Sequence, residues 1–367
     1  MKVALVHDDL IQWGGAERVL LAMQEIWPDA PIFTSAVNQK IVNKHLPQAK
    51  IFSSFVQKLP FAQTFERQYF FLQPLAFESF DFSGYDVVIS STSRFAKGVI
   101  TKPQTMHITY CHTPSRFLWS FETTSPSDYL RRLEGPLSPS LKLLKKWDLI
   151  SAARPDLWIS NSDWVGKRIA KIYQKEAKTI YPFVDLTRFK DVQNERGEYL
   201  LVVSRLVKWK KIELAIDAVK SMDIPLKIVG SGPDLGRLKS KAFKKVEFIT
   251  EASDEEVVHL MANCLALLVC HEEDFGMVAI EVQAAGRPVI AFKNSGTSEA
   301  VIDGKTGVIF DSQNVESIRG AVSRLKDLTI DPDACRDQAA RFDKEIFKQK
   351  LLQFTKMSYN KYQKTNG

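Results

Sequence analysis

The sequence lacks an apolar stretch long enough to cross a membrane. Its 367 residues are 45% hydrophobic and 25% charged, as is typical of soluble globular proteins, and no run reaches the ~18 consecutive apolar residues of a spanning helix. The N-terminal stretch MKVALVHDD turns acidic after one strand-length apolar run, so we expect no secretory signal there. A chain of this length exceeds one typical hydrophobic core, and two domains are therefore expected.

Cysteine is also scarce. The four cysteines are Cys111, Cys264, Cys270 and Cys335. They show no closely spaced pair of the kind that binds a metal, and two of them belong to a predicted core strand. This usage argues against a disulfide framework and against a zinc site. It predicts reduced, buried thiols in a cytosolic protein.

Positive charge is concentrated in one block of the chain. The net charge is +7, and between Arg131 and Lys178 eleven Lys and Arg residues stand against five Asp and Glu. The chain also carries aromatic and leucine-rich stretches, FSSFVQKLPF and RQYFFLQPLAF. Together these features suit a surface that rests on anionic lipid. Helices with solvated basic faces over an ordinary core fit equally well, and no nucleic-acid-binding module is recognisable.

Strands and helices alternate along the whole chain, which predicts an α/β protein with two doubly wound, Rossmann-like domains facing each other across a cleft. The polar stretch 191–198 (DVQNERGE) is the best candidate for a linker. We therefore expect an N-terminal domain over residues 1–190 and a C-terminal domain over 198–345. A helix in 346–367 is expected to cross back to the N-terminal domain.

Two features of the first half lie just after predicted strands. Gly14 and Gly15 separate a strand from a helix, an arrangement that brings backbone amides close to a ligand phosphate. Two adjacent glycines also serve any tight turn between a strand and a helix. His112 follows a strand, where ligands of open α/β sheets bind; a structural histidine is the alternative.

The stretch HEEDFGMVAIE, residues 271–281, has the strongest chemical character. It follows an apolar run that reads as a buried parallel strand, and it leads into a predicted helix. Glu273 falls in the loop and Glu281 on the helix. The amides of Phe275, Gly276 and Met277 would point out of the helix start, where no intrahelical acceptor exists. This suits a polyhydroxylated, partly anionic ligand, although an ordinary capped helix with two solvated glutamates also fits.

Further polar residues follow other strands of the second half. Arg205 ends the strand LLVVS and Lys210 comes five residues later, which predicts a diphosphate clamp made of one planar and one point-like cation. Gly230, in Gly-Ser-Gly, allows the backbone to approach a ligand closely. Ser295 and Gly296 precede another helix start, expected at Ser298. All these residues would lie along one edge of the sheet.

With these motifs in place, the chain resembles the retaining, GT-B-fold glycosyltransferases of family 4. The motifs that carry the resemblance are VHDDLIQWGGAERV, YCHTPSRFLW, SRLVKWKK, ANCLALLVCHEEDFGMVAIEVQAAGRPVIA and SGTSEAVIDGKTGVIF. YCHTPSRFLW, SNSDWVGKRIAKIY and YPFVDLTRF look most like the mannosyltransferase-like branch that builds bacterial surface polysaccharides. The resemblance covers nearly the whole chain.

The resemblance implies a role for each matching residue of the second half. Arg205 and Lys210 would hold the donor's diphosphate and stabilise the leaving nucleoside diphosphate. Glu281 would bind the ribose hydroxyls and Glu273 the hydroxyls of the donor sugar. Gly230 and the amides at 275–277 would complete the donor site.

In the first half, His112 would face the donor sugar, and Gly14 and Gly15 would bring amides near the phosphate and the acceptor. The residues expected to take part in catalysis are His112, Arg205, Lys210 and Glu273. No metal or other cofactor is expected, because the fixed cations would do that work and no Asp-x-Asp metal motif stands out. In the implied mechanism of front-face attack, the leaving phosphate takes the acceptor's proton and anomeric configuration is retained.

The resemblance further implies a hexosyltransferase, expected to move mannose from GDP-mannose to a lipid-linked oligosaccharide or surface-polysaccharide acceptor. We expect a cytoplasmic protein, peripheral on the inner face of the cell membrane. A UDP-sugar-dependent enzyme of the same fold is one alternative, and a non-catalytic sugar-nucleotide-binding scaffold is another. The sequence departs from the family at Asp274 and Lys211, where glycine is often found, and at Ser295, where a glycine pair is common.

Overall fold

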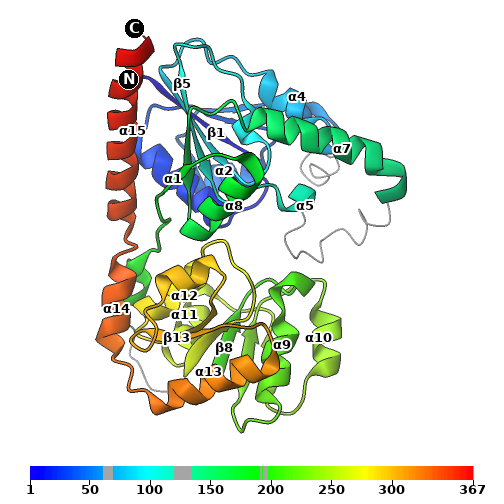
Figure 1. The fold of residues 1–367 in the computed structure, drawn as a ribbon, viewed down its shortest axis with the longest axis vertical. Helices are drawn as coiled ribbons and strands as arrows, with labels where there is room; N and C mark the ends of the chain where they lie inside the picture. The colour runs from blue at the N-terminus through cyan, green and yellow to red at the C-terminus, as the bar shows by residue number, and fades with distance from the viewer. Residues whose placement is uncertain (61–68, 120–133, 191, 193–196, 367) are drawn as a thin grey trace. The chain divides into compact units, whose positions relative to one another are not determined.

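The computed structural model describes residues 1–60, 69–119, 134–190, 192 and 197–366. It divides into two units (Figure 1). Among the described residues, unit 1 takes in 1–119 and 134–181 together with the C-terminal segment from Glu345, and unit 2 takes in Pro182–Lys344. Residues 191 and 193–196 of the predicted linker lie outside the described residues, and position 192 belongs to unit 2.

Unit 1 is built on a parallel sheet of seven strands in the order β3-β2-β1-β4-β5-β6-β7. The strands are β1 (Val3–His7), β2 (Ile32–Thr34), β3 (Ile51–Ser53), β4 (Val87–Thr92), β5 (Met106–Cys111), β6 (Leu157–Ser160) and β7 (Ala177–Thr179). All six residues of both β4 and β5 are buried, as expected for central strands covered on both faces. The residues that follow these central strands therefore lie at the carboxyl edge of the sheet.

The helices of unit 1 alternate with these strands. They are α1 (Gly15–Ile26), α2 (Gln39–His45), α4 (Gln73–Glu78), α5 (Arg116–Trp119), α7 (Glu134–Ser151), α8 (Asp163–Tyr173) and α15 (Lys344–Asn366), with 3-10 helices η1 (Phe55–Lys58) and η3 (Ala96–Gly98). Ser162 is the N-cap of α8, since its hydroxyl accepts the amide of Val165 at 3.0 Å.

The C-terminal helix α15 packs within unit 1. Lys348 lies 3.5 Å from Glu25 of α1, and the ring of Phe347 meets that of Tyr110 edge-on at 5.9 Å between centroids. Further along, the hydroxyl of Tyr362 donates to the carbonyl of Pro103 at 2.8 Å. These contacts hold the last helix on the same unit as the first strands.

Unit 2 repeats the design with a parallel sheet of six strands in the order β10-β9-β8-β11-β12-β13. The strands are β8 (Leu200–Val203), β9 (Leu226–Val229), β10 (Val246–Ile249), β11 (Ala266–Val269), β12 (Val289–Phe292) and β13 (Gly307–Phe310). Two Rossmann-like α/β units were the predicted fold class, and the structure confirms them. Within the described part of the chain, no helix is both long and apolar enough to span a bilayer.

The helices of unit 2 are α9 (Ile212–Val219), α10 (Leu235–Lys241), α11 (Asp254–Ala262), α12 (Met277–Ala284), α13 (Val315–Asp327) and α14 (Pro332–Ala340), with 3-10 helices η4 (Leu186–Phe189), η5 (Lys208–Lys210) and η6 (Gly296–Ala300). The helix expected to start at Ser298 is therefore only the short η6. Its own serines explain this: the hydroxyl of Ser298 donates to the carbonyls of Lys293 and Ser295, and the chain turns extended at Val301.

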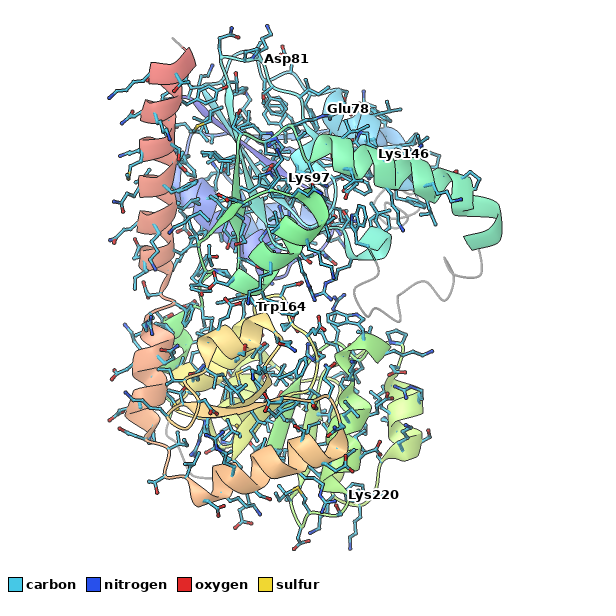
Figure 2. All side chains as sticks on the ribbon, viewed as in Figure 1. Glu78, Asp81, Lys97, Lys146, Trp164 and Lys220 are labelled. Carbon is cyan, nitrogen blue, oxygen red and sulfur yellow. The ribbon has the colours of Figure 1, made fainter. Side chains whose placement is uncertain are left out.

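A buried ion pair crosses the interior of unit 1. Lys97, labelled in Figure 2, and Asp148 of α7 are 2% and 0% exposed, and the ammonium lies 2.5 Å from the carboxylate. The same carboxylate accepts the indole N–H of Trp119 at 2.7 Å and the hydroxyl of Tyr173 at 2.8 Å. These three groups, from separate segments, thus depend on one anion.

Replacing this anion should destabilise unit 1 strongly. Asp148→Ala leaves the ammonium of Lys97 buried without its counter-charge, a change that costs about 3–5 kcal/mol of the free energy of unfolding. Thermal or urea unfolding would measure it. The matched control is Asp333→Ala, which removes an exposed pair with Arg336 and should shift the unfolding midpoint little. Equal shifts for the two variants would contradict the prediction.

Candidate active site

The polar residues predicted along unit 2 follow neighbouring strands. Strands β9, β8, β11 and β12 are adjacent and parallel, so the segments after them leave the sheet at one edge. Arg205 and Lys210 follow β8, Gly230 follows β9, Glu273 follows β11 and Ser295 follows β12. The described structure shows contacts among several of these residues, whereas the side chain of Arg205 is exposed.

Lys210 and Glu273 form the charged centre of this edge. The ammonium of Lys210 pairs with the carboxylate of Glu273 and lies 2.9 Å from Nε2 of His271. His271, which is 6% exposed, also pairs with Glu273. The ring of Trp209 packs beside both, with the Lys210 ammonium 4.2 Å from its centroid. A cation, an imidazole and a carboxylate are thus held within one hydrogen-bonded cluster.

The electrostatics of the cluster favour an ionised Glu273. Burial acts to raise the pKa of this carboxyl, but the charge of Lys210 and the contacts with His271 outweigh it. As a result, the pKa lies well below its ordinary value. The side chain keeps 22% of its surface exposed, so it remains accessible to a ligand. The sequence predicts that Lys210 and Glu273 bind different parts of a ligand. In the structure, which holds no ligand, the two side chains pair with each other.

The loop of Glu273 is fastened to the start of η6. The hydroxyl of Ser295 accepts the amide of Glu273 at 2.9 Å, and the amide of Gly296 donates to the carbonyl of Glu273 at 2.8 Å. A Cβ atom at Gly296 would lie 2.0 Å from the carbonyl oxygen of Asp274, so this contact requires glycine. Ser295, one of the departures from the family pattern, thus orients the loop directly.

Helix α12 begins where the sequence predicted. Gly276 is its N-cap, with φ of +84°, and a Cβ atom there would lie 2.2 Å from Oγ1 of Thr297. The amides of Gly276 and Met277 therefore belong to a first turn that has no intrahelical acceptors. Glu281, one helical turn further on, lies 3.7 Å from the guanidinium of Arg188 on η4.

The structure gives a backbone role to Lys211, one of the departures from the family pattern. It takes the left-handed conformation, with φ of +49°, and serves as the N-cap of α9. This is the backbone region that favours glycine, which accounts for the glycine often found at this place in the family. Its ammonium donates to Gln313 at 2.5 Å, and Gln313 donates to the carbonyl of Cys270 at 2.8 Å.

Gly230 has a packing role of its own. Its φ is +134°, and a Cβ atom would lie 2.0 Å from the carbonyl oxygen of Ser204. The loops after β8 and β9 can approach each other because this residue is glycine. Gly230 therefore shapes the loop that carries Arg205, whatever contact it makes with a ligand.

In unit 1, the predicted residues Gly14 and His112 belong to one polar network. The amide of Gly14 donates to the carboxylate of Glu17 at 2.7 Å, so this amide already has an acceptor inside the protein and differs from the phosphate donor that the sequence predicted. Gly15 is the first residue of α1. Nε2 of His112 lies 2.8 Å from the hydroxyl of Ser91.

The sequence reasoning missed several residues of these networks. His271 and Arg188 stand inside the quoted motifs HEEDFGMVAIE and YPFVDLTRF, yet received no role. His7 and Glu17 flank the glycine turn, and Ser91 belongs to a small polar run at the end of β4. A signal was available for each, since polar residues at the carboxyl ends of parallel strands converge.

The predicted burial of the cysteines is confirmed. All four cysteines are free and buried, and burial raises the pKa of the thiols of Cys264, Cys270 and Cys335 to about 12. Such thiols are unreactive near neutral pH. Among the residues that the structure covers, no group of three or more His, Cys, Asp or Glu side chains is arranged to hold a metal ion.

Two Rossmann-like units in one chain are the GT-B fold, which solved glycosyltransferase structures share. The HepE protein of Anabaena, solved in complex with UDP and glucose, superposes with a TM-score of 0.68 at 18% identity, over 97% of this chain and 99% of HepE. At this identity the likeness establishes the fold alone.

Residues 184–342 match the family model described as glycosyl transferases group 1, so unit 2 contains a glycosyltransferase group 1 domain. An uncharacterized glycosyltransferase of Methanocaldococcus jannaschii is 29% identical over 46% of this chain and 49% of its own length. The GDP-mannose-dependent alpha-(1-6)-phosphatidylinositol monomannoside mannosyltransferase of Mycolicibacterium smegmatis is 34% identical over 36% of this chain and 39% of its own. The chain spans half or less of the length of these relatives.

The lowered pKa of Glu273 predicts a specific acid dependence of stability. Above the ordinary carboxyl range, the ionised side chain contributes its full stabilisation. As the pH falls below about 5, the unfolded chain takes up a proton first, and this stabilisation is lost progressively down to the lowered pKa of the folded state. Glu273→Gln, and to a lesser degree Lys210→Met, should flatten this part of the curve of unfolding midpoint against pH. A Glu273→Gln curve that keeps the wild-type slope would contradict the assignment.

Proposed function

We propose that the protein is a retaining glycosyltransferase that transfers a hexose from a nucleotide sugar. The observation that carries the proposal is the Lys210–Glu273–His271 cluster beside the start of α12, on a glycosyltransferase group 1 domain. A cation and a helix start are suited to a diphosphate, and carboxylates are suited to sugar and ribose hydroxyls. All these groups occupy one edge of one sheet.

In the proposed reaction, the diphosphate of the donor replaces Glu273 as the anion that pairs with Lys210. The diphosphate draws Lys210 away from Glu273, and the released carboxylate accepts hydrogen bonds from the sugar hydroxyls. Lys210 and Arg205 then stabilise the charge that develops on the leaving nucleoside diphosphate. The leaving phosphate takes the proton of the attacking acceptor hydroxyl, so neither a side-chain base nor a metal ion is part of the proposal. Glu281 binds the ribose, held in place by Arg188.

For the donor, we propose GDP-mannose, which is supported by the mannosyltransferase of Mycolicibacterium smegmatis among the relatives. UDP-sugars are the alternative, since HepE was solved with UDP and glucose. For the acceptor, we propose a lipid-linked oligosaccharide or a surface polysaccharide. The remaining alternative is a scaffold that binds a sugar nucleotide without transferring the sugar.

A panel of sugar nucleotides tests the donor and the reaction together. GDP-mannose should raise the thermal unfolding midpoint and undergo slow hydrolysis, and UDP-glucose and UDP-galactose should have smaller effects. Arg205→Ala and Lys210→Ala should each lower turnover by about 10²–10³-fold, because each removes charge stabilisation of the transition state. Lys208→Ala, an exposed cation on the same 3-10 helix as Lys210, is the matched control.

The outcomes separate the alternatives. A larger shift with UDP-sugars would replace GDP-mannose as the donor. Thermal stabilisation by a sugar nucleotide without hydrolysis or transfer would favour the scaffold. A cellular role that Lys210→Ala leaves unchanged would favour it as well. No shift with any member of the panel would overturn the enzymatic proposal.

We also propose that helix α7 rests on an anionic membrane surface. Its exposed side combines Leu143, Leu149 and Ile150, which are 70%, 44% and 64% exposed, with three exposed lysines, Lys142, Lys145 and Lys146. Figure 2 labels Lys146 on this helix, and Glu78 on the neighbouring α4. Glu78 accepts the indole N–H of Trp147 at 2.7 Å, so α4 and α7 are joined. Apolar side chains flanked by lysines are typical of interfacial helices.

Vesicle co-sedimentation tests this surface. The wild-type protein should bind vesicles that contain phosphatidylglycerol more tightly than pure phosphatidylcholine vesicles. Replacing the three lysines by glutamine should weaken binding about tenfold or more, and Leu143→Ser with Ile150→Ser should weaken it on both lipids. Met357→Ser, at an equally exposed apolar residue of α15, is the control. Binding that ignores the anionic lipid would count against the proposal.

A further inference from the structure

His271 contacts both charged members of the cluster on which the proposed donor site is built. Its Nε2 lies 2.9 Å from the ammonium of Lys210, and the same nitrogen pairs with the carboxylate of Glu273. Lys210 and Glu273 also pair with each other. The three groups therefore form a closed triangle, in which the carboxylate has two nitrogen partners.

The imidazole has a fixed place in this triangle. Its ring is 6% exposed and meets the indole of Trp209 edge-on, with 5.5 Å between the centroids and 79° between the planes. The carbonyl of Cys270, the preceding residue, accepts a hydrogen bond from Gln313 at 2.8 Å. His271 and Glu273 are separated by Glu272 alone, so both side chains belong to the same short loop.

Lys210 comes from a different segment. It is the last residue of η5, which follows β8, whereas His271 and Glu273 follow β11. Its flexible four-carbon stem can direct the ammonium to another acceptor without any change in the loop after β11. In the proposed reaction that acceptor is the diphosphate, and Glu273 then loses one of its two nitrogen partners. His271 is the partner that remains.

The charge of the imidazole decides whether Glu273 stays compensated. The carboxylate side chain is 22% exposed, and a carboxylate largely withdrawn from water is costly without a counter-charge. An ammonium 2.9 Å from Nε2 disfavours a proton on that nitrogen, and its departure removes this repulsion. The carboxylate and the incoming diphosphate both favour the proton. Donor binding and protonation of His271 therefore promote each other.

We propose that His271 is a positioning residue of the donor site, which holds Glu273 as an imidazolium once the diphosphate has taken Lys210. The inference rests on the proposed function, because it concerns the donor-bound form of the same cluster. Solvent supplies the proton to Nε2 in those molecules that lack it before binding, and no bond between heavy atoms changes. Glu273 thus keeps a cation beside it when it accepts the sugar hydroxyls.

The charged groups around the imidazole give this linkage one direction. Lys210 disfavours the proton until the diphosphate draws it away, and Glu273 favours it. Glu272 and Asp274 are the other acids of the loop, and a nearby anion favours protonation of an imidazole. The ammonium of Lys211 is hydrogen-bonded at 2.5 Å to a glutamine after β13. We therefore expect tighter donor binding at lower pH.

Isothermal titration calorimetry of the full-length protein with GDP-mannose tests the linkage, with UDP-glucose as a second probe. Neither sugar nucleotide has a terminal phosphate, the group that titrates near pH 6, so the phosphates add no ionisation between pH 6 and 8. Wild-type affinity should be about tenfold higher at pH 6 than at pH 8, which one linked proton can supply over this range. Two buffers that differ in ionisation enthalpy should show net proton uptake on binding.

Substitutions distinguish a positioning role from a structural one. His271→Asn keeps a polar side chain but cannot carry the charge, so it should remove the pH dependence and the proton uptake and weaken binding chiefly at pH 6. His271→Gln serves as a second variant with the same expectation. The matched control is His259→Asn, at an exposed histidine of α11 in the same unit, which should behave as the wild type does.

The outcomes separate this inference from the proposed function. Wild-type affinity that stays constant between pH 6 and 8, or a His271→Asn variant that keeps the wild-type dependence, would overturn the inference alone. Binding weakened by the same factor at every pH would also overturn it, because that result shows a structural role. Absence of binding by every sugar nucleotide would overturn the proposed function, and this inference with it, and the donor panel would show the same result independently.

Discussion

Parallel strand pairing is the constraint on which both polar networks depend. Each strand pairing in the two described sheets is parallel, so all strands of a sheet end at the same edge. Residues far apart in the sequence therefore come into contact at this edge, although no pattern in the sequence pairs them. Lys210 reaches Glu273 across 63 positions, and His7 reaches Ser91 across 84. The glycines and serines of the connecting loops adjust this edge.

The two networks differ in how they compensate a buried charge. Removing a charge from water is costly unless a partner compensates it. In unit 2 the compensation is direct, since Lys210, His271 and Glu273 share one cluster. In unit 1 the buried carboxylate of Glu17 accepts the amide of Gly14 and lies 3.8 Å from Nε2 of His7.

Much of this could be read from the sequence, because the signals were local. The alternation of strands and helices indicated two α/β units, and the Phe-Gly turn marked the start of α12. The prediction at Ser298 was less successful, because a serine that bonds to the preceding carbonyls closes a single 3-10 turn.

The sequence by itself determined two α/β units, the polar residues after their strands and the resemblance to a glycosyltransferase family. Only the tertiary structure decided which of these residues touch. It paired Lys210 with Glu273, gave the Gly14 amide to Glu17, and placed His7 and Ser91 behind His112. The physical reason is that periodicity and propensity act over a few residues, whereas these contacts depend on strand order and register, which the packing of the whole sheet fixes.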